Sequence, residues 1–228
     1  MKGEGELKKI IGLSIAIALI VALIGTGTWA LFSDQETATD NTFTAGTLNL
    51  QVGAADPCTE SIDIGGDNGM VPGDSGNAAT WLTRNTGSIA GDLSISLSEI
   101  TNNENEVKEP ETGDGGEPGE LGANLKVAFW MDGNKSGDWD HTSDYYLKSD
   151  QTKVAYTSGG PALPTEAYAT LDSYNSDSWA DVQTNVAGST DFGNFRVEYD
   201  LPSATTDIVQ SDSCVFTITF DLDQYVAP

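Results

Sequence analysis

The residues best suited to chemistry in this sequence lie in one acidic loop, 132–144. Oxygen donors occupy the first, third, fifth and ninth positions of this loop and a glycine the sixth, as in the calcium loop of an EF-hand. Such spacing turns alternate side chains inward, and glycine permits the sharp bend. The pattern therefore predicts a Ca²⁺ site with the ligands Asp132, Asn134, Ser136, Asp138, Asp140 and Asp144.

Two departures from that pattern leave an alternative open, a solvated hairpin turn without metal. The twelfth position holds Ser143 where a bidentate glutamate is usual, and the residues before the loop have the pattern of a strand, not a helix. The sequence Asn134-Lys135-Ser136 is also a glycosylation sequon. A glycan on Asn134 would compete with a ligand role.

The single histidine, His141, lies in the same loop. Zinc hydrolases generally use three protein ligands, often histidines at helical spacing, and this sequence has no His-Glu-x-x-His motif. It also lacks a nucleophile elbow and a glycine-rich phosphate loop. We therefore predict that the chain is not an enzyme, has no catalytic residues and takes no small-molecule substrate.

The overall charge limits the possible partners. Ten basic residues against 35 acidic residues give a formal net charge of −25. Binding to phosphate groups requires clustered cations, so nucleic acid is excluded as a partner. Residues 99–120 hold eight carboxylates and one lysine, which predicts a solvated insertion, with cation binding as the alternative.

Two cysteines, Cys58 and Cys214, stand far apart in the chain. Metal or redox cysteines of cytosolic proteins more often lie close together, as in Cys-x-x-Cys. Two isolated cysteines in an exported chain favour one long-range disulfide between Cys58 and Cys214. The alternative is two buried free thiols.

The N-terminus has the features of an export signal. Lysines precede an uncharged run of fifteen residues, 10–24, which is the length of a signal-peptide core. Small residues stand at the −3 and −1 positions of a cut after Ala30, so the mature chain is predicted to begin at Leu31. A retained membrane anchor and a pilin-type signal are the alternatives.

The rest of the chain alternates apolar and polar residues in short runs separated by Gly, Pro, Asp and Asn turns. This period of two is typical of strands with one buried face, and predicts an all-β, antiparallel β-sandwich. The segment 164–182 is expected to hold short helices, with Thr165 and Ser176 as N-caps. The predicted strands include 47–52, 79–85, 91–98, 125–129, 195–201 and 214–222.

Two blocks of sequence resemble the TasA/camelysin-like secreted proteins. Residues 25–34, Gly-Thr-Gly-Thr-Trp-Ala-Leu-Phe-Ser-Asp, and residues 41–50, Asn-Thr-Phe-Thr-Ala-Gly-Thr-Leu-Asn-Leu, are similar to the family's signature. Residues 71–76, 84–91 and 216–224 resemble its later strands. The resemblance implies a jelly-roll-like sandwich, release by signal peptidase, and an extracellular subunit of a filament, pilus or biofilm-matrix fibre.

The resemblance also implies how such a fibre assembles. Fibre-forming relatives use donor-strand exchange, in which the segment after the cleavage site completes the sheet of the next subunit. Here that segment is 31–46, with Leu31, Phe32 and Phe43 as its apolar anchors. The expected layout is a signal peptide over 1–30, a donor segment over 31–46 and a sandwich domain over 47–228. The alternatives are a monomeric calcium-binding surface adhesin and a camelysin-like surface metallopeptidase.

Overall fold

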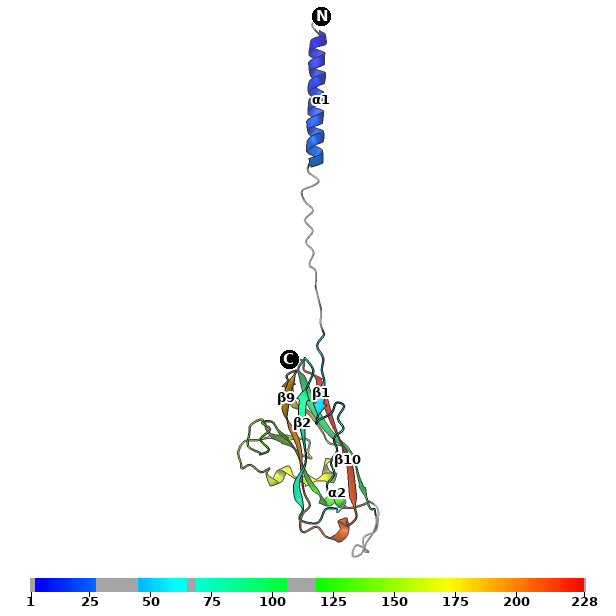
Figure 1. The fold of residues 1–228 in the computed structure, drawn as a ribbon, viewed down its shortest axis with the longest axis vertical. Helices are drawn as coiled ribbons and strands as arrows, with labels where there is room; N and C mark the ends of the chain where they lie inside the picture. The colour runs from blue at the N-terminus through cyan, green and yellow to red at the C-terminus, as the bar shows by residue number, and fades with distance from the viewer. Residues whose placement is uncertain (1–2, 28–44, 65–68, 106–117, 228) are drawn as a thin grey trace. The chain divides into compact units, whose positions relative to one another are not determined.

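The computed structural model describes residues 3–27, 45–64, 69–105 and 118–227 of the 228-residue chain. The chain divides into two compact units, residues 1–44 and residues 45–228. Helix α1, Gly3–Gly27, belongs to the first unit (Figure 1). None of the helices in the described ranges is both long enough and apolar enough to cross a membrane.

The larger sheet of the second unit has seven strands in antiparallel pairs. Six of them follow the order β1-β2-β9-β4-β5-β6, and β7 pairs with the remaining part of the β4 edge. Figure 1 shows β1, β2 and β9 side by side, as this order requires. The bounds are β1 Leu50–Val52, β2 Ser75–Asn85, β4 Lys126–Asp132, β5 Tyr145–Leu147, β6 Lys153–Ala155, β7 Ala169–Thr170 and β9 Thr190–Asp200.

The smaller sheet has three antiparallel strands in the order β10-β3-β8. Its strands are β3 Gly91–Asn103, β8 Ser178–Val186 and β10 Ser213–Gln224. Short helical turns lie between strands: α2 Leu121–Asn124, η2 Thr165–Ala167, η3 Leu171–Tyr174 and η4 Asp207–Val209. Together the two sheets confirm the predicted all-β sandwich.

The core lies between the two sheets, because the inward residues of both alternate along their strands. Strand β3 contributes Leu93, Ile95 and Leu97, and β9 contributes Phe195 and Val197, all fully buried. A smaller cluster of buried residues is built on the opposite face of β4 and β5, from Ala128, Trp130, Trp139, Tyr146 and Ala167. Strand β4 is therefore buried on both faces and carries no period of two.

The segment 164–182 holds two short helical turns, η2 and η3, as predicted, but both predicted N-caps are wrong. Pro164, not Thr165, precedes the η2 turn, and Ser176 precedes strand β8 instead of a helix. Strand β8 buries Trp179, Val182 and Val186. Their spacings of three and four residues are those of a helix, but here they arise from bulges that add residues to β8 opposite β3.

Candidate functional site

The two sheets leave a groove between the edge strands β1 and β10. Among the described strands, β10 pairs only with β3, and β1 pairs only with β2. A cavity of about 680 Å³ lies along these two edges. It is lined by Leu50, Val52, Asp56, Pro57, Cys58, Glu60, Ser61, Ile62, Trp81 and residues 214–220 of β10.

Strand β10 presents a row of apolar side chains to this groove. Inward residues alternate with exposed ones along the strand, as the sequence predicts, but every inward residue is only partly buried. On the neighbouring strand β3, the equivalent side chains are 0–1% exposed. The rings of the row still contact the core. Phe220 lies with its ring centroid 4.9 Å from that of Phe195, and Phe216 lies 6.2 Å from Phe129.

The wall opposite β10 consists of β1 and the loop that follows it. This loop begins at Gly53, whose φ of 73° favours glycine. The side chain of Glu60 accepts a hydrogen bond from the backbone N–H of Ala54 at 2.8 Å, and the amide of Asn49 donates to Asp56 at 2.8 Å. These two bonds hold the loop beside β1, and Ile62 packs from it against the core.

Both cysteines line this groove, Cys214 from β10 and Cys58 from the loop after β1. Both are free thiols in the structure, Cys58 exposed and Cys214 partly buried. Burial raises the pKa of Cys214 to about 11, and the nearby carboxylate of Asp172 adds to that shift. The disulfide between them stays a prediction, and the structure places its two partners on the same cavity.

The predicted calcium loop follows β4, and its two end carboxylates are fully buried. Asp132 accepts hydrogen bonds from the backbone N–H groups of Ser136 at 3.1 Å and Gly137 at 2.9 Å. One oxygen of Asp132 also lies 3.8 Å from Nη1 of Arg196. Asp144 accepts from the backbone N–H groups of Gly133, Asp140 and His141. These bonds fix the loop through its own backbone.

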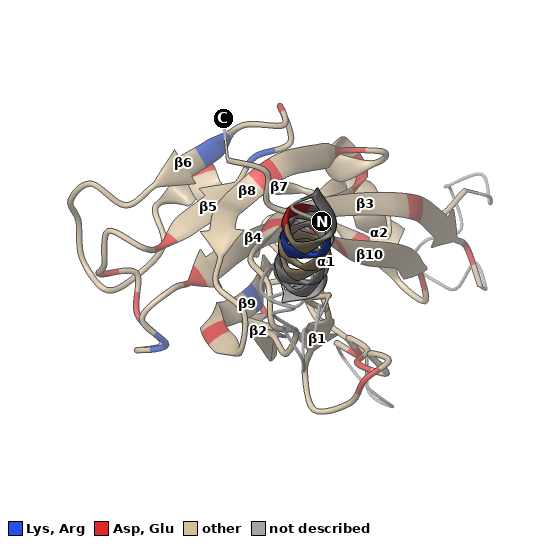
Figure 2. Ribbon diagram, turned by 90° about the horizontal axis from the view of Figure 1, so that it is seen from above, with Lys and Arg blue, Asp and Glu red and all other residues tan. Residues whose placement is uncertain are grey.

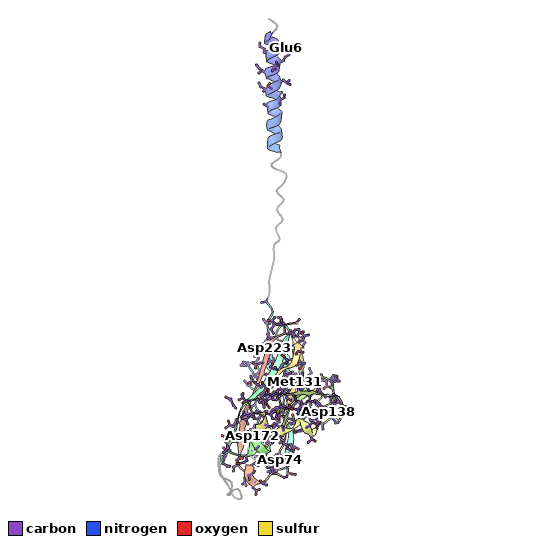
Figure 3. All side chains as sticks on the ribbon, turned by 180° about the vertical axis from the view of Figure 1, so that it is seen from behind. Glu6, Asp74, Met131, Asp138, Asp172 and Asp223 are labelled. Atoms are coloured by element: carbon purple, nitrogen blue, oxygen red, sulfur yellow. The ribbon has the colours of Figure 1, made fainter. Side chains whose placement is uncertain are left out.

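The middle of the loop brings several predicted ligands together at the surface. Asp140 accepts hydrogen bonds from the amide of Asn134 at 3.0 Å and from the hydroxyl of Ser136 at 3.2 Å. Asp138 lies at the periphery of the domain, whereas Met131 of β4 lies in its interior (Figure 3). The side chains at loop positions three, five and nine therefore converge, and the metal assignment of the loop stays a prediction.

A second group of carboxylates was not singled out from the sequence as a site. Ligand oxygens of Glu104, Glu120 and Asp212 lie within 4.8 Å of one another, and all three residues are partly buried. Asp212 also accepts hydrogen bonds from the backbone N–H groups of Glu120 and Leu121. Glu104 and Glu120 come from the acidic stretch 99–120, whose charge was the one sign of this group in the sequence. Asp212 is 92 residues from Glu120, so no local pattern could have joined it to them.

Other predicted residues fall outside the described ranges. The cleavage site at Ala30 and Leu31 and the donor anchors Leu31, Phe32 and Phe43 all lie within 28–44. The described domain begins beyond them. Thr47 donates its backbone N–H to the hydroxyl of Ser88 at 2.8 Å and accepts from the backbone N–H of Ser88 at 2.7 Å. The chain is thus hydrogen-bonded to its own domain from Thr47 onward.

The sequence matches a known protein family over most of its length. The family model of camelysin metallo-endopeptidases matches residues 6–224. This match confirms the resemblance to TasA/camelysin-like proteins. Comparison with curated proteins gives no match.

The family description overturns the prediction that the chain is not an enzyme, because it names a metal-dependent endopeptidase. Among the described residues, the group with metal-ligand spacing consists of carboxylates alone and contains no histidine. The ring of His141 lies instead 2.8 Å from the hydroxyl of Ser143. Oxygen donors suit a hard cation such as Ca²⁺ or Mg²⁺, and they do not fit the nitrogen-rich ligand set usual for zinc peptidases.

Figure 2 adds that acidic positions are spread over the ribbon and that basic positions are few. A chain with a formal net charge of −25 favours binding of cations over binding of anions. Because the matching family model spans nearly the whole chain, this protein belongs to the camelysin metallo-endopeptidase family, whose members are in general surface or secreted proteins.

Proposed function

We propose that this protein is an exported subunit of an extracellular filament, such as a pilus or a biofilm-matrix fibre. Signal peptidase releases the chain after Ala30, and segment 31–46 of one subunit enters the groove between β1 and β10 of the next. The observation that carries this proposal is the row of partly exposed apolar residues on β10, which faces an open cavity of about 680 Å³.

An extended segment supplies what both sides of the groove lack. An edge strand has backbone N–H and C=O groups without strand partners, and an added strand satisfies them. Each strand has one such edge here, since β1 and β10 each pair with a single described strand. Each subunit then donates a strand to one neighbour and accepts a strand from another. Such head-to-tail contacts form an open filament unless the rotation between subunits closes a ring.

Burial of the β10 row gives an estimate of the gain. Complete burial of one large apolar side chain contributes about 1.5–3 kcal/mol, so covering the exposed remainder of five partly buried residues contributes on the order of 2–3 kcal/mol. Each backbone hydrogen bond to the new strand adds about 1 kcal/mol. The five residues are Cys214, Phe216, Ile218, Phe220 and Leu222.

Negative-stain microscopy of the mature chain, residues 31–228, tests the proposal against a chain that lacks residues 31–45. We expect fibres from the first and monomers from the second, with the same cooperative unfolding transition in both. A synthetic peptide of residues 31–46 should bind the shortened chain, and the same peptide with Phe32→Ser and Phe43→Ser should not. Fibres from the shortened chain would overturn the proposal.

We also propose Ca²⁺ as the cation of loop 132–144. The convergence of Asn134, Ser136 and Asp140 supports this, together with the spacing of oxygen donors. Calorimetric titration with Ca²⁺ should give heat for the wild type and none for Asp140→Asn, while Asp223→Asn on β10 serves as the control. Equal heats for the wild type and Asp140→Asn would place the cation elsewhere.

The family description supports a second candidate function, a metal-dependent endopeptidase. The carboxylates of Glu104, Glu120 and Asp212 are the described residues that would hold a cation for it. An assay of the mature chain on an unfolded protein substrate, with and without a chelator, tests this candidate. Cleavage that is lost with the chelator and in Asp212→Asn would support it, and chelator-resistant cleavage or none would count against it.

A further inference from the structure

The two cysteines stand on the two walls of one groove. Cys214 is the second residue of β10 and pairs with Asn102 of β3, so its position is fixed by the sheet. Cys58 is exposed and lies in the loop after β1. No described residue of this loop is part of a strand. The side chains of both line the same cavity. Movement of the loop toward β10 would bring the two thiols together.

A disulfide and an inserted strand cannot share this level of the groove. A strand lies about 4.8 Å from each neighbour, so the two walls must stand about 10 Å apart to hold one between them. A disulfide requires its two Cα atoms to lie roughly 4.4–6.8 Å apart. Joining the walls at Cys58 and Cys214 therefore leaves no room for a strand to pass between them.

We propose that Cys58 and Cys214 form a reversible disulfide that closes the groove, so that only the reduced subunit accepts a donor strand. This inference rests on the proposed assembly by strand donation and adds a means of controlling it. The oxidised subunit is a protected monomer, because its groove is closed at the level of Cys214 and a donor strand cannot pass that point.

The chemistry is thiol–disulfide exchange with a small or protein disulfide as the oxidant. The exposed Cys58 thiolate attacks a sulfur of the oxidant, forms a mixed disulfide and releases one thiolate. The Cys214 thiolate then attacks the sulfur of Cys58 and releases the second thiolate. Two thiols of the protein are oxidised to one disulfide, the oxidant is reduced to two thiols, and the protons of Cys58 and Cys214 pass to solvent and then to the released thiolates.

The second step depends on the Cys214 thiolate, which is scarce at neutral pH because the pKa of Cys214 is raised to about 11. The rate of this second step should therefore keep rising with pH above about 8.5, where the reaction of an ordinary exposed thiol levels off. This gives the closing step a signature that the reaction of an exposed cysteine alone would not have.

The test compares polymerisation of the mature chain, residues 31–228, after treatment with dithiothreitol or with oxidised glutathione. We expect oxidised wild type to be monomeric on a non-reducing gel, to have no free thiols and to polymerise at least tenfold more slowly by light scattering. Dithiothreitol should restore polymerisation. Cys58→Ser and Cys214→Ser should polymerise equally well under both treatments.

The outcomes separate this inference from the proposed function. If reduced wild type and both serine variants all fail to polymerise while folded, strand donation itself is wrong. If reduced wild type polymerises and the fully oxidised monomer polymerises as fast, the closing disulfide is overturned. A disulfide between two chains, or a stable glutathione adduct on Cys58 alone, would overturn it as well.

Discussion

The smaller sheet has two edge strands, β8 and β10, and they meet solvent differently. On β8 the three inward residues, Trp179, Val182 and Val186, are 2–4% exposed. On β10 all inward residues are partly exposed. Bulges interrupt β8, with Asp181 and Asn185 in left-handed conformation at φ of 50° and 54°. Strand β10 has a single register shift and otherwise pairs regularly with β3.

Side-chain hydrogen bonds also tie β8 to other segments. The ammonium of Lys153 donates to the backbone carbonyl of Val182 at 2.6 Å, and the indole of Trp179 donates to the carbonyl of Lys148 at 3.0 Å. Bulges, and charged side chains at an edge, are the usual protection against strand addition. Within the described residues, one edge of this sheet is thus protected and the other has no strand partner, so under the proposed assembly the added strand is expected at β10.

The largest effect is expected from placing a charge inside the open edge. Ile218→Lys puts an ammonium among the apolar residues of the groove, and an inserted strand would have to bury it. We expect no fibres by electron microscopy and a folded monomer by circular dichroism. Asp221→Lys, on the exposed face of the same strand and outside the lining of the cavity, is the control and should still polymerise. Normal fibres from Ile218→Lys would show that β10 is not the acceptor.

The protected β8 edge should contribute more to the stability of the monomer than the β10 edge does. Trp179→Ala removes a side chain that is 2% exposed, and should lower the free energy of unfolding by about 3–5 kcal/mol. Phe216→Ala on β10 removes a partly exposed ring and should cost less than half as much. Denaturation by urea measures both values. Equal losses would mean that the two edges are equally packed in solution.

A smaller effect is expected at the lysine that covers β8. Lys153→Ala leaves the carbonyl of Val182 open to solvent and should lower the free energy of unfolding by about 1 kcal/mol, because the lost bond is charged but near the surface. Lys148→Ala is the control, since its ammonium bonds to the exposed Asp150. Association of Lys153→Ala monomers, measured by sedimentation, would show that this lysine also protects the β8 edge. Unchanged stability of Lys153→Ala would contradict the stabilising role of the bond to Val182.

The smallest effect is expected at Asp177, just before β8. Burial raises the pKa of its carboxyl above the usual range. The folded chain therefore binds this proton more readily than the unfolded chain does, so ionisation of Asp177 destabilises the fold as the pH rises. Asp177→Asn should gain a little stability near pH 7 and show a flatter pH profile from about pH 4 upward. Urea denaturation at several pH values measures this, and an unchanged profile would contradict it.

The strands that follow a strict period of two were predictable from the sequence. β3 and β10 carry one apolar residue at every second position because one face of each is turned toward the core. The period fails at β8, where bulges produce helical spacing, and at β5, where Tyr145, Tyr146 and Leu147 are all buried. Both failures arise from contacts with other strands, which a local pattern does not contain.

The candidate site was predictable in its parts and not in its assembly. The sequence draws attention to Cys58, Cys214 and the alternating residues of the last strand. That they line one groove depends on strand order, which brings the edge at β1 beside the edge at β10 although the chain places them at opposite ends of the domain. The carboxylates Glu104, Glu120 and Asp212 meet for the same reason.

The position of Trp81 on β2 has a practical consequence. Trp81 lines the groove and keeps 9% of its surface exposed, with its ring centroid 6.4 Å from that of Phe220, whereas Trp130, Trp139 and Trp179 do not line that cavity and are at most 4% exposed. A segment that fills the groove removes water from one indole and leaves these three in their present surroundings. Intrinsic fluorescence of the unlabelled domain should therefore shift to shorter wavelength as the groove is occupied, and the emission of a Trp81→Phe variant should not move.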